Sequence, residues 1–190
     1  MNLAFIWKVL YWGWFASEIF LVIRTRARAK AGDKLRDRGS LYILWGTISA
    51  CMIAGIYVGE AFPPNLPGDK NIYRLIALGM LILGLIIRWW AIYTLGRSFS
   101  VNVALREGQH VVKKGLFSLV RHPSYLGMMI IFIATGLMER SYYSMAIILI
   151  PIFFALSYRI HVEEIALREG FGQEYIDYSK RTKRLIPLIY

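Results

Sequence analysis

Five apolar stretches dominate this sequence and restrict what the chain can fold into. They are residues 3–23, 41–62, 72–95, 126–138 and 142–157. The first three contain about 20 residues or more, enough for a helix to cross roughly 30 Å of hydrocarbon. The last two are shorter, so they are either spans whose polar ends line a site or a re-entrant pair. Because 57% of the 190 residues are apolar, more than a soluble domain contains, we expect an all-α integral membrane protein with about five transmembrane helices.

Basic residues are distributed unevenly among the segments that join these stretches. Of the 23 lysines and arginines, seven lie in residues 24–38, five in residues 97–121 and six in residues 159–184. With five spans, all three segments lie on one side of the membrane, and the positive-inside rule assigns that side to the cytoplasm. The sequence therefore predicts an outside N-terminus and a cytoplasmic C-terminus. The net charge of +11 then reflects loops beside anionic headgroups, and we do not expect nucleic acid as a partner.

The chain is expected to form a single membrane domain over residues 1–190, in two parts. Residues 1–95 supply three spans and the basic connector between the first two. Residues 96–190 supply a polar loop over 96–124, two spans and an amphipathic helix over 160–180 that breaks at Gly170 or Gly172. The loop is long for a connection between neighbouring spans, and such loops are usually functional. We therefore expect the site in the second part.

Cysteine and histidine are too few and too scattered for a disulfide or a metal site. Cys51 is the only cysteine and lies within the second apolar stretch. The three histidines His110, His122 and His161 lack the regular spacing of metal ligands. We expect neither a disulfide within the chain nor a bound metal.

A basic pair precedes a proline at the start of the fourth apolar stretch. Proline needs no N–H partner at the first helical position, so Pro123 is expected to begin this helix. Arg121 and His122 then lie at the helix N-terminus, where the dipole favours anions or polar ligand groups. Alternatively, the pair anchors the helix among lipid headgroups beside Tyr125. The residues alone leave both interpretations open.

Three ionisable residues lie near the predicted cytoplasmic ends of spans, where charge beside hydrocarbon suggests function. Arg159 and Glu163 share one helical face, so they either form a surface ion pair or bind separate partners. In the second case, Glu163 accepts hydrogen bonds from a ligand and Arg159 holds a substrate carboxylate. Arg88 either extends to the membrane surface or faces the bundle and meets a substrate anion, and we favour the bundle.

Five motifs follow one another in the second part of the chain. They are Gln109-His110-Val111-Val112-Lys113-Lys114-Gly115-Leu116-Phe117, Arg121-His122-Pro123-Ser124-Tyr125-Leu126-Gly127, Glu163-Glu164, Phe171-Gly172-Gln173-Glu174-Tyr175-Ile176-Asp177-Tyr178 and Arg184-Leu185-Ile186-Pro187. With these motifs, residues 96–190 resemble the isoprenylcysteine carboxyl methyltransferase family, and most of all its short prokaryotic members with five spans. Any one motif is weak, whereas the ordered set is specific.

The resemblance implies a membrane methyltransferase that uses S-adenosyl-L-methionine without a Rossmann domain, and the sequence has no GxGxxG loop. The methyl-accepting carboxylate is implied to bind Arg159, with Arg88 as a second substrate arginine and Glu163 as the third catalytic residue. Two positions depart from the family pattern, because Gln109 replaces a common histidine and Phe117 a frequent tyrosine. The residues implied to bind the cofactor are Gln109, His110, Val111, Val112, Phe117, Arg121, His122, Pro123, Ser124, Tyr125 and Glu163.

The resemblance thus predicts O-methylation of a lipophilic, isoprenylcysteine-like carboxylate at the cytoplasmic face of a prokaryotic membrane. The acceptor could instead be a phospholipid amine or another small lipophilic amine or thiol. The tail Tyr178…Ile186-Pro187-Leu188-Ile189-Tyr190 is also similar to NADPH-dependent sterol-reductase-like proteins, which are usually much longer. A non-catalytic membrane scaffold of the same fold is the third alternative. The sequence does not indicate the oligomeric state.

Overall fold

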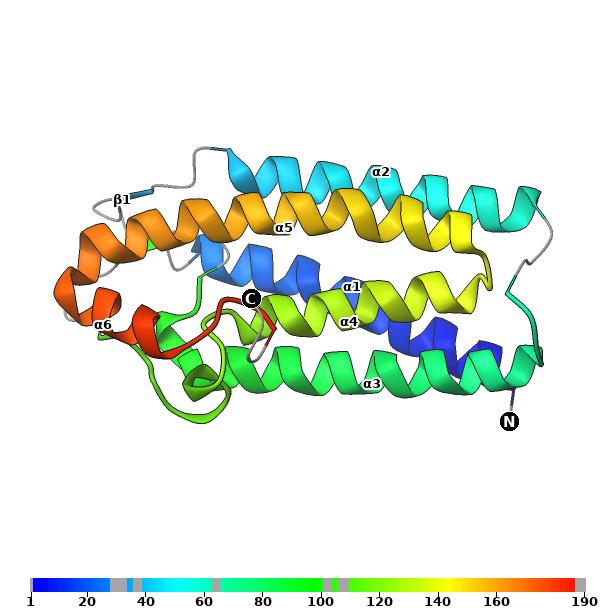
Figure 1. Cartoon of the computed structure of the whole chain (residues 1–190), viewed down its shortest axis with the longest axis horizontal. Coiled ribbons are helices and arrows are strands. Elements are labelled where there is room, and N and C mark those ends of the chain that lie inside the picture. The colour runs from blue at the N-terminus through cyan, green and yellow to red at the C-terminus, as the bar shows by residue number, and fades with distance from the viewer. Residues whose placement is uncertain are drawn as a thin grey trace.

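The structure of the protein is a computed structural model that describes residues 2–27, 34–35, 39–62, 66–100, 104–105 and 110–186. Within these residues, two 3-10 turns, η1 (Gly96–Ser98) and η2 (Gly115–Ser118), and two short strands, β1 (Lys34–Leu35) and β2 (Ala104–Leu105), accompany the helices. The helices (Figure 1) are α1 Leu3–Ala27, α2 Ser40–Ala61, α3 Lys70–Leu95, α4 Pro123–Met138, α5 Tyr142–Phe171 and α6 Gln173–Arg181.

The long helices have the length and surface of membrane spans. In the described residues, α1, α2, α3 and α5 are long and apolar enough to cross a membrane, and α4 is a shorter apolar helix of 16 residues. Large apolar side chains face outward, among them Phe5, Ile53, Tyr57 and Phe154, each more than 60% exposed. Such a surface suits lipid rather than water. The protein is an all-α integral membrane protein, as predicted, while the count of five spans stays a prediction because α4 is short.

The fifth apolar stretch continues without a break into the cytoplasmic helix predicted after it. The sequence analysis expected a separate amphipathic helix over residues 160–180, whereas α5 runs from Tyr142 to Phe171 as one helix. No glycine or proline lies between Pro151 and Gly170, so nothing interrupts the backbone hydrogen bonds. The break falls at Gly172, one of the two predicted positions, where φ is +55° and the backbone N–H donates to the Arg168 carbonyl.

A pair of glycines brings α3 and α4 into unusually close contact. A Cβ atom built on Gly84 would lie 2.7 Å from the Gly127 carbonyl oxygen, and one built on Gly127 would lie 2.7 Å from that of Gly84. Small residues at such crossings let helix backbones approach. Arg88 follows Gly84 by one turn and Ser124 precedes Gly127 by one turn, so the crossing sets these two side chains side by side.

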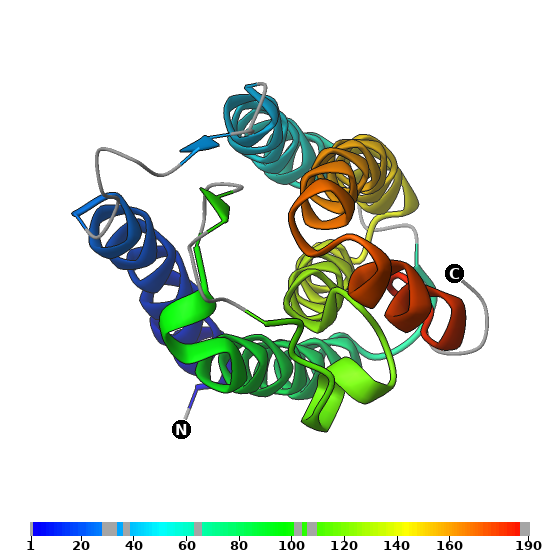
Figure 2. The ribbon, with the colours of Figure 1, turned by 90° about the vertical axis from the view of Figure 1, so that its left-hand side faces the viewer.

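The helices form a curved row in the spatial order α1, α3, α4, α5 and α2 (Figure 2). Gly55 of α2 faces Ile148 of α5, and the Ser144 hydroxyl donates to the Gly55 carbonyl over 2.8 Å. The Gly55-x-x-x-Gly59 spacing therefore serves packing within the bundle. At one end, β1 pairs with β2 in antiparallel register, Lys34 opposite Leu105. This pairing ties the connector before α2 to the loop after α3.

Candidate active site

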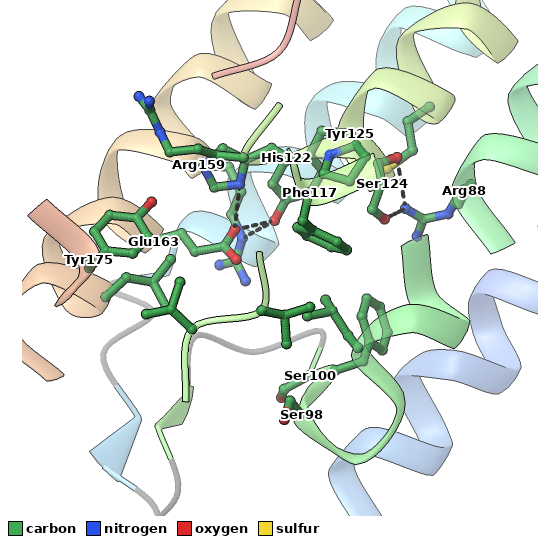
Figure 3. Close-up of a pocket in the computed structure, with 18 of the residues that line it drawn as sticks. Arg88, Ser98, Ser100, Phe117, His122, Ser124, Tyr125, Arg159, Glu163 and Tyr175 are labelled. Atoms are coloured by element: carbon green, nitrogen blue, oxygen red, sulfur yellow. Dashed lines mark hydrogen bonds and ion pairs between the residues drawn. The ribbon is translucent and has the colours of Figure 1, made fainter. Parts of the chain in front are cut away.

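A cavity lies at the end of the bundle where α3 ends and α4 begins (Figure 3). The space between its walls is about 1210 Å³ when the open mouth is included. All six helices and the loop between α3 and α4 contribute to its walls. The polar part is lined by Glu18, Arg88, His110, Arg121, His122, Ser124, Tyr125, Arg159, Glu163, Tyr175 and Tyr178, and the apolar part includes Leu41, Leu44, Trp45, Val111, Val112, Phe117, Met128, Leu167 and Phe171.

The N-terminus of α4 forms one wall of this cavity. Pro123 is the first helical residue, as predicted, and His122 is the N-cap without a side-chain capping bond. Pro123 has no N–H, and the N–H groups of Tyr125 and Leu126 already donate to the His122 carbonyl. This end of α4 therefore presents chiefly the positive end of its dipole to the cavity. The imidazole of His122 stacks on the Tyr125 ring at a centroid distance of 5.7 Å.

Arg121, Glu164 and Arg184 form a tail clamp that holds the C-terminal segment against the start of α4. The carboxylate of Glu164 accepts hydrogen bonds from Arg121 Nε at 2.7 Å and Arg184 Nε at 3.1 Å. Arg121 Nη1 also donates to the carbonyls of Ser179, at 2.9 Å, and Thr182. The backbone joins in, because the N–H groups of Arg121 and His122 donate to the carbonyls of Lys183 and Arg184. The second, third and fifth motifs of the sequence therefore meet in one structural unit.

Tyr125, Arg159 and Glu163 form a central group at the middle of the cavity, as the close-up shows (Figure 3). The Tyr125 hydroxyl donates to Glu163 Oε2 over 2.9 Å, and Arg159 Nε donates to the same hydroxyl over 3.4 Å. Arg159 Nη1 donates to the Ser40 hydroxyl at 2.5 Å. Arg159 is 2% exposed, whereas the Glu163 side chain is 29% exposed. The group thus presents a buried cation and an accessible carboxylate to the same space.

Arg88 lies inside the bundle rather than at the membrane surface. Its guanidinium is buried and pairs with both carboxylate oxygens of Glu18 on α1. The remaining donor, Nη1, reaches the Ser124 hydroxyl at 2.7 Å. The indole N–H of Trp14 donates to Glu18 Oε1 at 3.0 Å. Arg88 therefore lines the cavity as predicted, with its fork already engaged by a carboxylate of the protein.

Aromatic side chains from the loop and α6 close another side. Tyr178 donates its hydroxyl to the Phe117 carbonyl over 2.6 Å, and burial raises the pKa of Tyr178 to about 12. Burial, helped by the carboxylates of Glu164 and Glu163, raises the pKa of Tyr175 as well, so its phenol stays protonated at neutral pH. In the described part of the chain, the buried Tyr175 hydroxyl has no hydrogen-bond partner, whereas His122 Nε2 lies 3.6 Å from Glu164 Oε1. Unsatisfied buried polar atoms beside a cavity are suited to a polar ligand.

The structure gathers the predicted site residues around this one cavity. Arg88, Arg159 and Glu163 line it, as do the cofactor-binding candidates His110, Val111, Val112, Phe117, Arg121, His122, Pro123, Ser124, Tyr125 and Glu163. Gln109 lies outside the described residues. Arg121 contributes to the wall, but its guanidinium is taken up by the tail clamp. The roles of these residues stay predictions.

Five polar residues of the cavity were not predicted as site residues: Glu18, Ser98, Ser100, Tyr175 and Tyr178. Glu18 could have been predicted, because it is the only acidic residue in the first apolar stretch and ionisable residues within spans are functional by default. Tyr175 and Tyr178 lie in the fourth motif, but a tyrosine in an amphipathic helix is ordinarily a packing residue, so the motif alone did not assign them to the site.

Comparison with known proteins agrees with the motifs. Residues 77–169 match the model of the isoprenylcysteine carboxyl methyltransferase (ICMT) family. The chain is 34% identical over 127 residues to protein-S-isoprenylcysteine O-methyltransferase B of Arabidopsis thaliana, which covers 65% of this chain and 64% of that protein. It is 41% identical over 112 residues to the protein-S-isoprenylcysteine O-methyltransferase of Saccharomyces cerevisiae, which covers 58% and 47%.

The fold agrees as well. A solved structure of the eukaryotic intramembrane Ras methyltransferase ICMT superimposes with a TM-score of 0.60 at 27% identity, covering 75% of this chain and 51% of that one. The matched regions span from about half to just under two thirds of these relatives. The region of residues 77–169 therefore belongs to the isoprenylcysteine carboxyl methyltransferase family.

Proposed function

We propose that the protein is an S-adenosyl-L-methionine-dependent membrane methyltransferase that O-methylates the carboxylate of a lipophilic, isoprenylcysteine-like acceptor. One observation carries the proposal: a buried arginine and an accessible glutamate, joined through the Tyr125 hydroxyl, share a single cavity that also has an apolar wall. The match of residues 77–169 to the isoprenylcysteine carboxyl methyltransferase family model supports methyl transfer as the reaction class.

The donor half of the cavity suits an adenosylated amino acid. The Glu163 carboxylate is open to the cavity and fits an ammonium group, while the α4 N-terminus fits a carboxylate. Phe117 and the 110–112 segment offer apolar surface for a purine. The unpartnered Tyr175 hydroxyl supplies a further hydrogen bond. S-adenosyl-L-methionine, when bound, supplies an electrophilic methyl group on a sulfonium.

The acceptor half suits a carboxylate with an apolar tail. Arg159 supplies a buried positive charge that can pair with a carboxylate, and Leu41, Leu44 and Trp45 of α2 line the same cavity. A carboxylate is ionised at neutral pH, so this reaction needs no general base. The task of Arg159 is to orient the nucleophile, with Tyr125 and Ser40 fixing the guanidinium. Positioning of this kind lowers the barrier by removing translational and rotational freedom before reaction.

We infer that the cavity faces the cytoplasm of a prokaryotic cell and that the acceptor reaches it from the surrounding lipid. The basic segments 24–38, 97–121 and 159–184 support this orientation through the positive-inside rule. Helix α6, whose Tyr175 and Tyr178 line the cavity, lies at the end of the bundle where α3 ends and α4 begins (Figure 1).

The test is a methyl-transfer assay with purified protein, S-adenosyl-L-methionine carrying a labelled methyl group, and three acceptors of equal chain length. A prenylcysteine with a free carboxylate is expected to become labelled, and its amide and a prenylated amine are not. Base-labile methanol release identifies an ester. Labelling of the amine alone would replace the proposal with N-methylation, and labelling of none would favour a non-catalytic role.

A further inference from the structure

Glu18 and Arg88 form an ion pair inside the bundle that the proposed reaction does not require. Glu18 is 2% exposed and lies on α1, while Arg88 is 5% exposed and lies on α3. The two Arg88 donors Nε and Nη2 meet the two oxygens of Glu18, the parallel arrangement in which arginine recognises a carboxylate. Both residues line the cavity.

Because of this pair, Arg88 has no two parallel N–H donors left with which to bind a carboxylate of a ligand. Its third nitrogen, Nη1, is bound to the Ser124 hydroxyl at 2.7 Å and lies 3.4 Å from the Ser124 carbonyl. Glu18 is fixed in turn by the Trp14 indole N–H at 3.0 Å. The carboxylate of Glu18 therefore occupies the position that a second ligand carboxylate would take.

The cavity that the pair lines also has apolar walls, which include Leu44, Trp45 and Met128, and both partners are buried. Among the described residues, the cation that could offset a further negative charge here is Arg88, and Glu18 already neutralises it. Like charges in a dry environment repel far more strongly than in water.

We propose that Glu18 is a specificity-determining residue that fills the fork of Arg88 and limits the acceptor to a single anionic group, the one held by Arg159. This inference rests on the proposed function and narrows its substrate class to lipophilic monocarboxylates, excluding dicarboxylates and phosphorylated lipids. The competing view is that the pair only fastens α1 to α3. Apolar residues of similar volume could join α1 to α3 equally well. If the pair only joined the two helices, the number of negative charges on a ligand would not affect its affinity.

The test measures binding rather than transfer, so that its failure is separable from failure of the proposed function. Tetradecanoate and dodecylmalonate share the same dodecyl chain and differ by one carboxylate. Each is titrated calorimetrically into protein in a non-ionic detergent at pH 8. In the unsubstituted protein, the monoanion is expected to bind at least about tenfold more tightly, the value of one lost charge-assisted hydrogen bond. Equal affinities would overturn the proposal without any variant.

Glu18→Gln keeps the shape of the side chain and removes its charge, which frees the Arg88 fork. It is expected to bind dodecylmalonate roughly tenfold more tightly than the unsubstituted protein does, and to lose the preference for the monoanion. Trp14→Phe is the matched control, because it removes a hydrogen bond of Glu18 and keeps both charges, so the preference should persist. An unchanged preference in folded Glu18→Gln, or its loss in Trp14→Phe, would contradict the proposal.

Discussion

Glu163 and Glu164 are adjacent in the sequence, yet their carboxylates end in two different environments. Glu164 is 3% exposed and accepts hydrogen bonds from Arg121 and Arg184 in the tail clamp. Glu163 is 29% exposed and accepts from the Tyr125 hydroxyl, with its remaining surface open to the cavity. A carboxylate with its charge fully compensated by the protein holds structure together, whereas one with accessible oxygens can still bind a ligand.

The largest effect is expected from Glu164→Ala. This change leaves Arg121 buried without its counter-charge, and breaking such a pair costs about 3–5 kcal/mol. Thermal unfolding in detergent should register the loss, together with release of the C-terminal segment to protease. Asp177→Asn is the control, since its exposed pair with Lys180 should matter little. If the Glu164→Ala protein were as stable as the control, the tail clamp would not stabilise the fold.

Arg159→Ala sharpens the distinction between binding and transfer. The change removes the positive charge proposed to orient the acceptor, so methyl transfer should fall about 100-fold or more, while S-adenosylhomocysteine affinity stays within about twofold. Initial rates and calorimetry measure the two quantities separately. Arg181→Ala, at the exposed end of α6, controls for loss of one positive charge. An equal loss of S-adenosylhomocysteine affinity and of methyl-transfer rate would contradict the separate roles proposed for Arg159 and Glu163.

Gly127→Ala tests the crossing of α3 and α4, which sets Arg88 beside Ser124. Its Cβ would lie 2.8 Å from the Arg88 backbone nitrogen and 2.7 Å from the Gly84 carbonyl oxygen, so α3 and α4 must move apart. Overpacking of this kind costs about 1–3 kcal/mol, readable as a lower unfolding temperature. Gly79→Ala on α3 is the matched control, because nothing lies within 4 Å of its added Cβ. A stable Gly127→Ala protein would show that the crossing is not tight.

The smallest effect is expected from Tyr178→Phe, which removes the hydrogen bond to the Phe117 carbonyl and should cost about 1 kcal/mol at neutral pH. The folded pKa of about 12 lies above the unfolded value of about 10. The neutral phenol is thus favoured by folding, and this stability is present below pH about 10 and lost as pH rises toward 12. The unfolding temperature of the unsubstituted protein should therefore approach that of Tyr178→Phe over this range. Tyr93→Phe, on an exposed side chain, should show no such convergence.

The sequence predicted the helices and most of the cavity because both rest on local signals. Apolar length located α1 to α5, and Pro123 marked the start of α4. The motifs contained Glu163 and Tyr125, and the position of Arg159 at the end of the fifth apolar stretch marked it as a candidate. The partner of Arg88 was not predictable, because Glu18 lies 70 residues away and only the α1–α3 packing brings the two together. The opposite roles of Glu163 and Glu164 were equally hidden, since which face of α5 meets the tail depends on tertiary packing.

The most direct measurement is calorimetric titration of S-adenosylhomocysteine, with NADPH beside it, into the unsubstituted protein and into Glu163→Ala and Glu163→Gln. The account predicts binding of S-adenosylhomocysteine and not of NADPH. It also predicts at least a roughly tenfold loss of affinity in both variants at an unchanged unfolding temperature. Binding of NADPH alone, or full S-adenosylhomocysteine affinity without the Glu163 carboxylate, would contradict the account.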